Sequence, residues 1–87
     1  MNAAETEAAL RSEGLDPETW SNEPGHEYGH HSHPYHKVLV CLEGSITFHT
    51  GAGDVVLEEG DRLELPPGIE HAATVGPSGV TCVEAQR

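Results

Sequence analysis

Short apolar runs separated by turns fill the chain after Pro34. β-branched residues are enriched in these runs, and glycines fall between them. The runs cover residues 37–43, 45–50, 54–58, 62–65, 72–75 and 80–84. Turns that recur about every eight to twelve residues between short strands are typical of an all-β sandwich or barrel. We therefore predict an all-β structure for this part of the chain.

The first part of the chain follows a different pattern. Residues 3–13 are mostly good helix formers and are followed by Gly14, where a helix usually stops, so the pattern predicts one short helix. Its apolar side is narrow, which leaves a frayed acidic terminus as the alternative. Residues 15–34 are polar and carry prolines and glycines, a composition that favours irregular or edge-strand backbone. We expect Trp20 to pack on the domain as a lid rather than to line a ligand pocket.

The length of the chain limits it to one domain. Two independent cores in 87 residues would each fall below the size at which folding alone is usual. We assign residues 1–23 to the N-terminal helix and its connection, and residues 24–87 to a β-barrel. A core this small makes dimerisation or a bound metal ion a natural supplement to hydrophobic stability.

The run 37–43 is apolar on both faces. The residues expected to face the barrel interior alternate with a second apolar set, which consists of Val38, Val40 and Leu42. A strand that is apolar on both sides is buried on both sides, and in a one-domain barrel this favours a second subunit over the outer face. We therefore expect a homodimer.

Acidic residues dominate the charge of the chain. Fifteen Asp and Glu residues against four Lys and Arg residues give a formal net charge of -11. Such a chain repels phosphate backbones and anionic lipid, so we expect neither a nucleic-acid partner nor a membrane partner. No run approaches the roughly 20 apolar residues of a membrane span, and residues 1–13 do not resemble a signal peptide, so the expected location is cytoplasmic. In that reducing compartment Cys41 and Cys82 are expected as free thiols rather than as a disulfide or a metal or redox pair.

Histidines point to metal chemistry. Five of the seven lie within residues 26–36, a polar stretch that offers no packing reason for them. His31 and His33 are two residues apart, so on an extended strand both imidazoles project from one face, close enough to chelate one ion. Downstream, a turn built on proline and glycine opens a new strand with His71 on its inward face. A flexible carrier of several metal ions is the alternative, and it would not depend on His71.

The spacing of these residues resembles that of the cupin superfamily. The first cupin motif has an HxH pair, a Glu and then a Gly, and the second has the spacing G-x5-P-x-G-x2-H followed by an Asn. The matching residues are His31, His33, Gly44, Gly60, Pro66, Gly68 and His71. The resemblance covers about residues 24–83 and implies a cupin double-stranded β-helix, or jelly-roll barrel, in which His31, His33 and His71 hold one divalent transition metal ion. Three imidazole nitrogens suit Fe, Ni, Zn, Mn or Cu.

Two residues depart from the cupin pattern. Lys37 stands where the family has its carboxylate ligand, and Val75 stands where the second motif has Asn. A protonated lysine is repelled by a divalent cation, so we expect Lys37 to be displaced or exposed rather than to bind an anionic substrate. His36 is then the candidate fourth ligand. Strict alternation places it opposite His33, in a hydrogen bond outside the site, but Pro34 allows a bulge that would turn it inward.

The sequence thus predicts a small single-domain cupin that binds one divalent metal ion and a small-molecule ligand in the barrel mouth. If it is an enzyme, the resemblance implies a metal-dependent oxygenase or isomerase, since three protein ligands leave positions open on the metal. No catalytic residue and no organic cofactor is assigned. The alternative is a non-catalytic ligand-binding or sensing module whose metal is structural or absent, which the loss of the carboxylate ligand at Lys37 favours.

Overall fold

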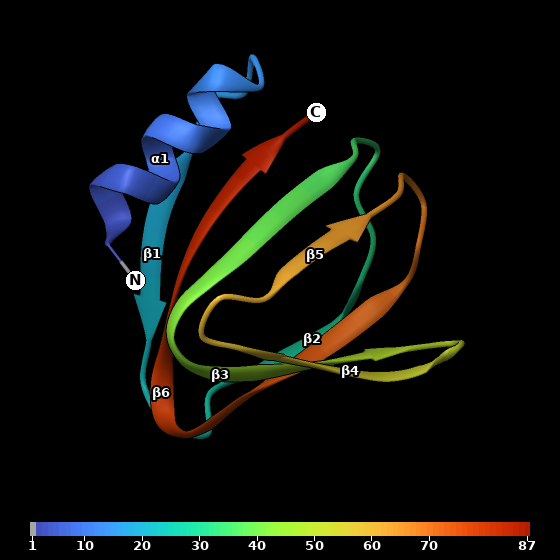
Figure 1. The fold of residues 1–87 in the computed structure, drawn as a ribbon. Coiled ribbons are helices and arrows are strands. Elements are labelled where there is room, and N and C mark those ends of the chain that lie inside the picture. The colour runs from blue at the N-terminus through green and yellow to red at the C-terminus, as the bar shows by residue number, and fades with distance from the viewer. Residues whose placement is uncertain (1) are drawn as a thin grey trace.

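The computed structural model describes residues 2–87 and confirms a mostly antiparallel β fold with a short N-terminal helix (Figure 1). Met1, the first residue of the predicted N-terminal segment, lies outside this range. Helix α1 spans Ala3–Ser12. The strands are β1 (Glu18–Asn22), β2 (Glu27–His31), β3 (Lys37–Thr50), β4 (Gly53–Glu58), β5 (Arg62–Leu65) and β6 (His71–Gln86).

β3 and β6 form the centre of the sheet. The strand order is β1-β6-β3-β4, with β2 also paired to β6 and β5 to β3. β3 and β6 pair along nearly their whole length, from Lys37 opposite Gln86 to Thr50 opposite His71. Each of them contains two of the predicted runs, joined through a bend instead of a turn. Figure 1 shows both strands curving strongly, so that one pair of strands contributes to both ends of the barrel.

β1 and β2 lie in the segment whose composition favours irregular or edge-strand backbone. Among the described strands, both pair only with β6, so both are edge strands. β1 falls within residues 1–23, so the sheet includes part of the segment assigned to the helix and its connection. The partners are far apart in the sequence, as with Trp20 opposite Cys82.

A bulge at Gly44 bends β3. The register of β3 against β6 shifts on both sides of this residue. Gly44 has a φ of 74°, and a Cβ atom added there would lie 2.0 Å from the carbonyl oxygen of Gly79. Only glycine tolerates both the positive φ and so close a backbone approach. The bulge also reverses the side-chain alternation, so Ile46 continues the inner face to which Cys41 belongs.

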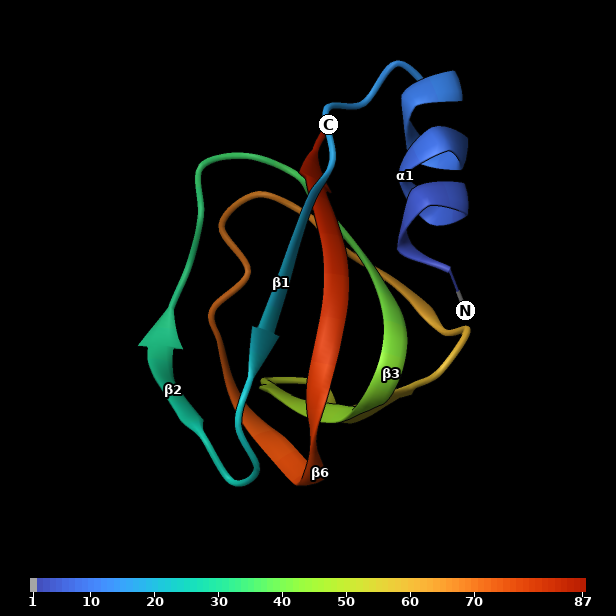
Figure 2. The ribbon, with the colours of Figure 1, turned by 90° about the vertical axis from the view of Figure 1, so that its left-hand side faces the viewer.

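Two apolar clusters lie on opposite faces of the central strands. The inner cluster fills the barrel and contains Leu39, Cys41, Ile46, Phe48, Leu57, Leu65, Ala73, Val75, Val80 and Cys82. The outer cluster contains Leu10, Leu15, Val38, Val40, Leu42, Val83 and Ala85. Figure 2 shows α1 standing outside the sheet, where its Leu10 side chain is 1% exposed.

α1 therefore supplies the cover that the sequence pattern assigned to a second subunit. The outer apolar set of β3 is buried within the chain, with Val38 0% exposed. The homodimer stays a prediction, and the apolar outer face of β3 no longer supports it.

Local residues explain where α1 begins and ends. Asn2 caps its first turn by accepting a hydrogen bond from the Glu5 N–H at 3.2 Å, and Gly14 follows the last turn with a φ of 84°. These caps and the buried Leu10 distinguish α1 from the frayed terminus that was the alternative. Within residues 2–87, no helix has the length and apolar character needed to cross a membrane.

Cys41 and Cys82 are cross-strand partners in the inner cluster. Both are free, as predicted, and the structure also buries both completely. Burial raises the pKa of both thiols, to about 12 for Cys82. Neither sulfur is therefore a thiolate, the form that binds metal, near neutral pH.

Candidate metal centre

His31, His33 and His71 come from three segments that meet beside the barrel interior. His31 is the last residue of β2 and His71 is the first residue of β6, and the two are register partners. His33 follows in the loop between β2 and β3. The N–H of Gly68 donates a hydrogen bond of 2.8 Å to the His33 carbonyl, so the turn that leads into His71 also positions the His33 loop.

The three imidazoles form one compact group. Each offers a nitrogen, and these nitrogens all lie within 4.8 Å of one another. Their ring centroids are 4.4 to 5.4 Å apart. His71 is buried, whereas His31 and His33 are half-buried.

Backbone carbonyls orient two of the rings. Nδ1 of His31 donates to the carbonyl of Gly29 at 2.7 Å, and Nδ1 of His71 donates to the carbonyl of Ile69 at 3.0 Å. A proton held on Nδ1 leaves the lone pair of the other nitrogen, Nε2, free for a metal ion. This arrangement is the usual outer support of a histidine ligand.

His33 carries the clearest sign that a partner belongs here. Its Nε2 atom is buried and has no hydrogen-bond partner among the described residues. A buried polar atom without a partner is costly. A divalent metal ion coordinated by the three imidazoles would satisfy this atom, so the residues present fit such an ion.

The surroundings favour the neutral form of His33 and His71. Burial lowers the pKa of His33 and His71. The charges of Lys37 and of the His31 imidazole lower both pKa values further. A metal ligand must be the neutral imidazole, so the lowered pKa favours the binding form.

His36 lies outside the group. Its Nε2 atom is 2.8 Å from a carboxylate oxygen of Glu64 on β5, and this hydrogen bond is the first cause of the lowered pKa of Glu64. The structure therefore does not bring the candidate fourth ligand to His31, His33 and His71. The geometry corresponds to the hydrogen-bonded alternative that strict strand alternation predicts.

The remaining histidines also lie outside the group. His49, on the outer face of β3, contacts Asp54 and Thr74, each at 2.9 Å. His30 is exposed and lies 3.6 Å from Glu70. The ring of His26 packs on Tyr28.

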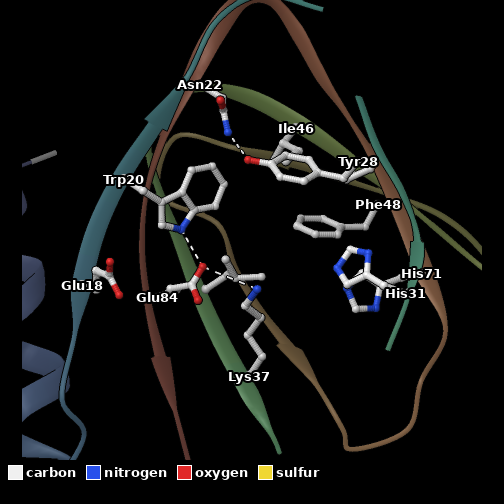
Figure 3. Close-up of a pocket in the computed structure, with 12 residues that line it drawn as sticks. Glu18, Trp20, Asn22, Tyr28, His31, Lys37, Ile46, Phe48, His71 and Glu84 are labelled. Carbon is white, nitrogen blue, oxygen red and sulfur yellow. Dashed lines mark hydrogen bonds and ion pairs between the residues drawn. The ribbon is translucent and has the colours of Figure 1, made fainter. Parts of the chain in front are cut away.

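A cavity of about 270 Å³ adjoins the histidine group (Figure 3). His31 and His71 are part of its wall. Apolar side chains of the inner cluster line one part, including Leu39, Ile46 and Phe48. The polar side chains in the wall are Glu18, Trp20, Asn22, Tyr28, Lys37 and Glu84.

Lys37 points into this cavity. Its side chain is 14% exposed, and its Nζ atom lies 3.5 Å from a carboxylate oxygen of Glu84. The same oxygen accepts a hydrogen bond of 2.6 Å from Nε1 of Trp20. Lys37 is thus drawn toward Glu84, but it stays in the wall of the cavity and is largely shielded from solvent. Trp20 lines the cavity as well as packing on the inner cluster.

Sequence reasoning missed Glu84 as a site residue. Glu84 shares its alternation with Val80 and Cys82, which both face the interior. That alternation was the available signal, because a carboxylate continuing an inward apolar face has to reach a cavity or a partner.

Tyr28 adds a phenol to the cavity wall. Its hydroxyl accepts a hydrogen bond from the side-chain amide of Asn22 (Figure 3). Burial, and then the negative charge of Glu84, raise the pKa of Tyr28. Near neutral pH the phenol is therefore protonated and can donate its proton to a ligand in a hydrogen bond.

Sequence and structure comparisons place the chain among known proteins. A family profile described as a cupin domain matches residues 19–82. An RmlC-like cupin from Shewanella frigidimarina is 25% identical, with a TM-score of 0.72 over 83% of this chain and 64% of that one. A cupin domain from Bordetella pertussis is 28% identical, with a TM-score of 0.64 over 83% of this chain and 79% of that one.

A structure reported for DMSP lyases is 27% identical, with a TM-score of 0.77 over 84% of this chain and 38% of that one. The chain thus spans less than two thirds of the length of the Shewanella protein and of the lyase. A comparison with curated protein sequences gives no significant match.

Proposed function

This chain belongs to the cupin family, and from that premise we propose that it binds one divalent transition metal ion and a small organic molecule. The ion is held by His31, His33 and His71, and the molecule occupies the adjoining cavity. Fe, Ni, Zn, Mn and Cu all suit three imidazole nitrogens.

One observation carries this proposal. The Nε2 atom of His33 is buried without a partner, beside two imidazoles whose Nδ1 atoms are already committed to backbone carbonyls. Three nitrogens that converge with free lone pairs need a common partner, and a metal ion is the partner that all three can share.

The open positions on such an ion support catalysis. When bound, the metal would supply Lewis-acid activation of the small molecule. Around it the chain offers the Tyr28 phenol, the Lys37 ammonium and the Glu84 carboxylate, which can hold or move a proton. A metal-dependent oxygenase or isomerase remains the reaction class that the family resemblance implies, and the likeness to a DMSP lyase adds lyase chemistry to these candidates.

A non-catalytic ligand-binding or sensing module is the second candidate. The observation that favours it is Lys37, a cation in the wall of the site where the family has a carboxylate ligand. The two candidates separate in a turnover assay of the metal-loaded protein with a cavity ligand, because the binding module would leave the ligand unchanged.

Metal analysis tests the proposal first. The protein is purified without chelators, dialysed against Fe²⁺, Ni²⁺ or Zn²⁺, and its bound metal is measured by mass spectrometry. We expect about one ion per chain in the wild type and about a tenth of that or less in His31→Ala and His71→Ala. His36→Ala and His49→Ala are matched controls that keep the metal.

The opposite results have separate meanings. No bound metal with any of these ions contradicts the proposal. Several ions per chain that survive His71→Ala would instead support a flexible carrier in residues 26–36.

A further inference from the structure

Lys37 places a positive charge beside a site suited to a cation. It lies on the inner face of β3, and its side chain enters the same cavity as His31 and His71 (Figure 3). His31, His71 and Lys37 line one cavity of about 270 Å³, so the charge of Lys37 lies beside the histidine group. A bound divalent ion would be repelled by this charge.

Glu84 offsets this charge only in part. Among the described residues it is the ion-pair partner of Lys37, at 3.5 Å, and the carboxylate oxygen involved also accepts the Trp20 hydrogen bond. A lysine ammonium has three N–H donors. The Lys37 ammonium therefore keeps donors for a ligand in the cavity.

The charges around the cavity leave room for one anion. With a divalent ion bound to three neutral imidazoles, the ion and Lys37 together outweigh the carboxylates of Glu18 and Glu84 by one positive charge. A monoanion would neutralise this surplus. The net charge of the whole chain, -11, repels every anion and repels dianions and trianions more strongly than monoanions.

The cavity also limits the size and character of the ligand. Its volume of about 270 Å³ is below the roughly 300–1,000 Å³ of pockets for drug-sized molecules. Leu39, Ile46 and Phe48 provide an apolar wall for the uncharged part of the ligand.

We propose that the cavity takes a small monocarboxylate whose carboxylate group lies between the metal ion and the Lys37 ammonium and contacts both. The shared anion relieves the repulsion between the two cations. Metal and carboxylate consequently bind cooperatively, each raising the affinity of the other by the same factor. This inference rests on the proposed metal site.

The test is a metal titration with and without a carboxylate. Ni²⁺ binding is measured by calorimetry in a non-coordinating buffer, alone and with saturating benzoate, a probe that chelates free metal weakly. In the wild type we expect benzoate to raise Ni²⁺ affinity about tenfold, within the usual range of coupling between two sites. Inorganic phosphate at the same concentration is the comparison ligand, and we expect it to have a smaller effect.

Two variants with opposite expected effects assign the coupling to Lys37. Lys37→Met removes the repulsion, so Ni²⁺ alone should bind more tightly than in the wild type while the benzoate effect shrinks severalfold. Glu84→Gln removes a negative charge from the cavity wall, so Ni²⁺ alone should bind more weakly while the benzoate effect grows. Circular dichroism and thermal melts establish that both variants are folded.

The outcomes separate this inference from the proposed function. A wild type that binds no Ni²⁺ contradicts the metal site itself. A wild type that binds Ni²⁺ without any effect of benzoate, or an undiminished benzoate effect in Lys37→Met, overturns the carboxylate site alone. A larger effect from phosphate than from benzoate also overturns the choice of a monocarboxylate.

Discussion

The two halves of β3, divided by Gly44, are buried in different ways. In the first half, consecutive residues from Val38 to Leu42 are all buried. In the second half, Ile46 and Phe48 are buried, and His49 on the other face is half exposed and hydrogen-bonded to polar neighbours. The difference arises because α1 covers the outer face of the first half only.

This contrast shows what an apolar pattern can establish. Two apolar faces show that a strand is covered on both sides, but they do not identify the cover. A ten-residue helix from the same chain provides it here, with Leu10 as its main contact. The inner face differs again, because it ends at polar groups that line a cavity.

The largest effect is expected at the bend that divides the two halves. Gly44→Ala puts a Cβ atom 2.0 Å from the Gly79 carbonyl oxygen at a positive φ, so we expect a loss of about 4 kcal/mol or more in the free energy of unfolding. Urea unfolding followed by circular dichroism measures it. Gly51→Ala is the control, because an added Cβ there meets nothing within 4 Å. Equal urea midpoints for the two variants would contradict the claim that the bend requires glycine at residue 44.

The next effect tests the cover of the first half. Leu10→Ala should lower the free energy of unfolding by about 2–5 kcal/mol, because a fully buried side chain is truncated. The exposed Ala8→Gln is the control on the same helix. The metal content of the folded protein should not change. An unchanged urea midpoint for Leu10→Ala would contradict the cover by α1. It would favour a second subunit on the outer face, which analytical ultracentrifugation would detect.

Acidification should lower the stability of the metal-free protein through His33 and His71. His33 and His71 have lowered pKa values in the folded chain. Below about pH 6.5 the unfolded chain therefore binds more protons at these two residues than the folded chain does. The stability of the metal-free protein is therefore full above that pH and falls as the pH decreases toward the folded pKa values. Thermal melts from pH 7.5 to 5 measure this slope.

A double variant assigns the slope to these histidines. His33→Asn combined with His71→Asn should flatten it. Glu13 does not interfere, because its pKa of about 2 in the folded chain, set first by the hydrogen bond from Arg62, places its own loss of stability at lower pH. The same slope in the double variant would show that other groups cause it.

The smallest effect is expected on the outer face of the second half. His49→Ala removes the contacts with Asp54 and Thr74 at a half-exposed position, so we expect a loss of about 1 kcal/mol or less. A double-mutant cycle with Asp54→Ala isolates the pair. A loss as large as that of Leu10→Ala would show that the two halves depend on their outer faces equally.

The strands of the barrel and the three converging histidines were predictable because their signals are local. Alternation marks the runs in β3 and β6, and the HxH pair and the proline-glycine turn before His71 have fixed spacings. The position of Leu10 on the outer face and that of Trp20 in the cavity wall depend on which distant segments pack together. Short sequence windows do not contain that information.

The positions of the Lys37 and His36 side chains depend on partners from other strands. Each side chain is held by a carboxylate far along the chain, Lys37 by Glu84 and His36 by Glu64. The alternation of β6 changes between Val75 and Val80, so the inward face of Glu84 follows from the run 80–84 but not from strict alternation counted from the start of the strand.

The pairing of β3 with β6 also has a kinetic consequence. Its register joins Lys37 to Gln86 and Thr50 to His71, so the central contacts of the barrel close long loops of chain. Proteins dominated by such distant pairings fold in about milliseconds to seconds, slower than helical domains of the same size. His71 meets His31 only when β2 and β6 have paired, so the metal site should appear during refolding no earlier than this pairing.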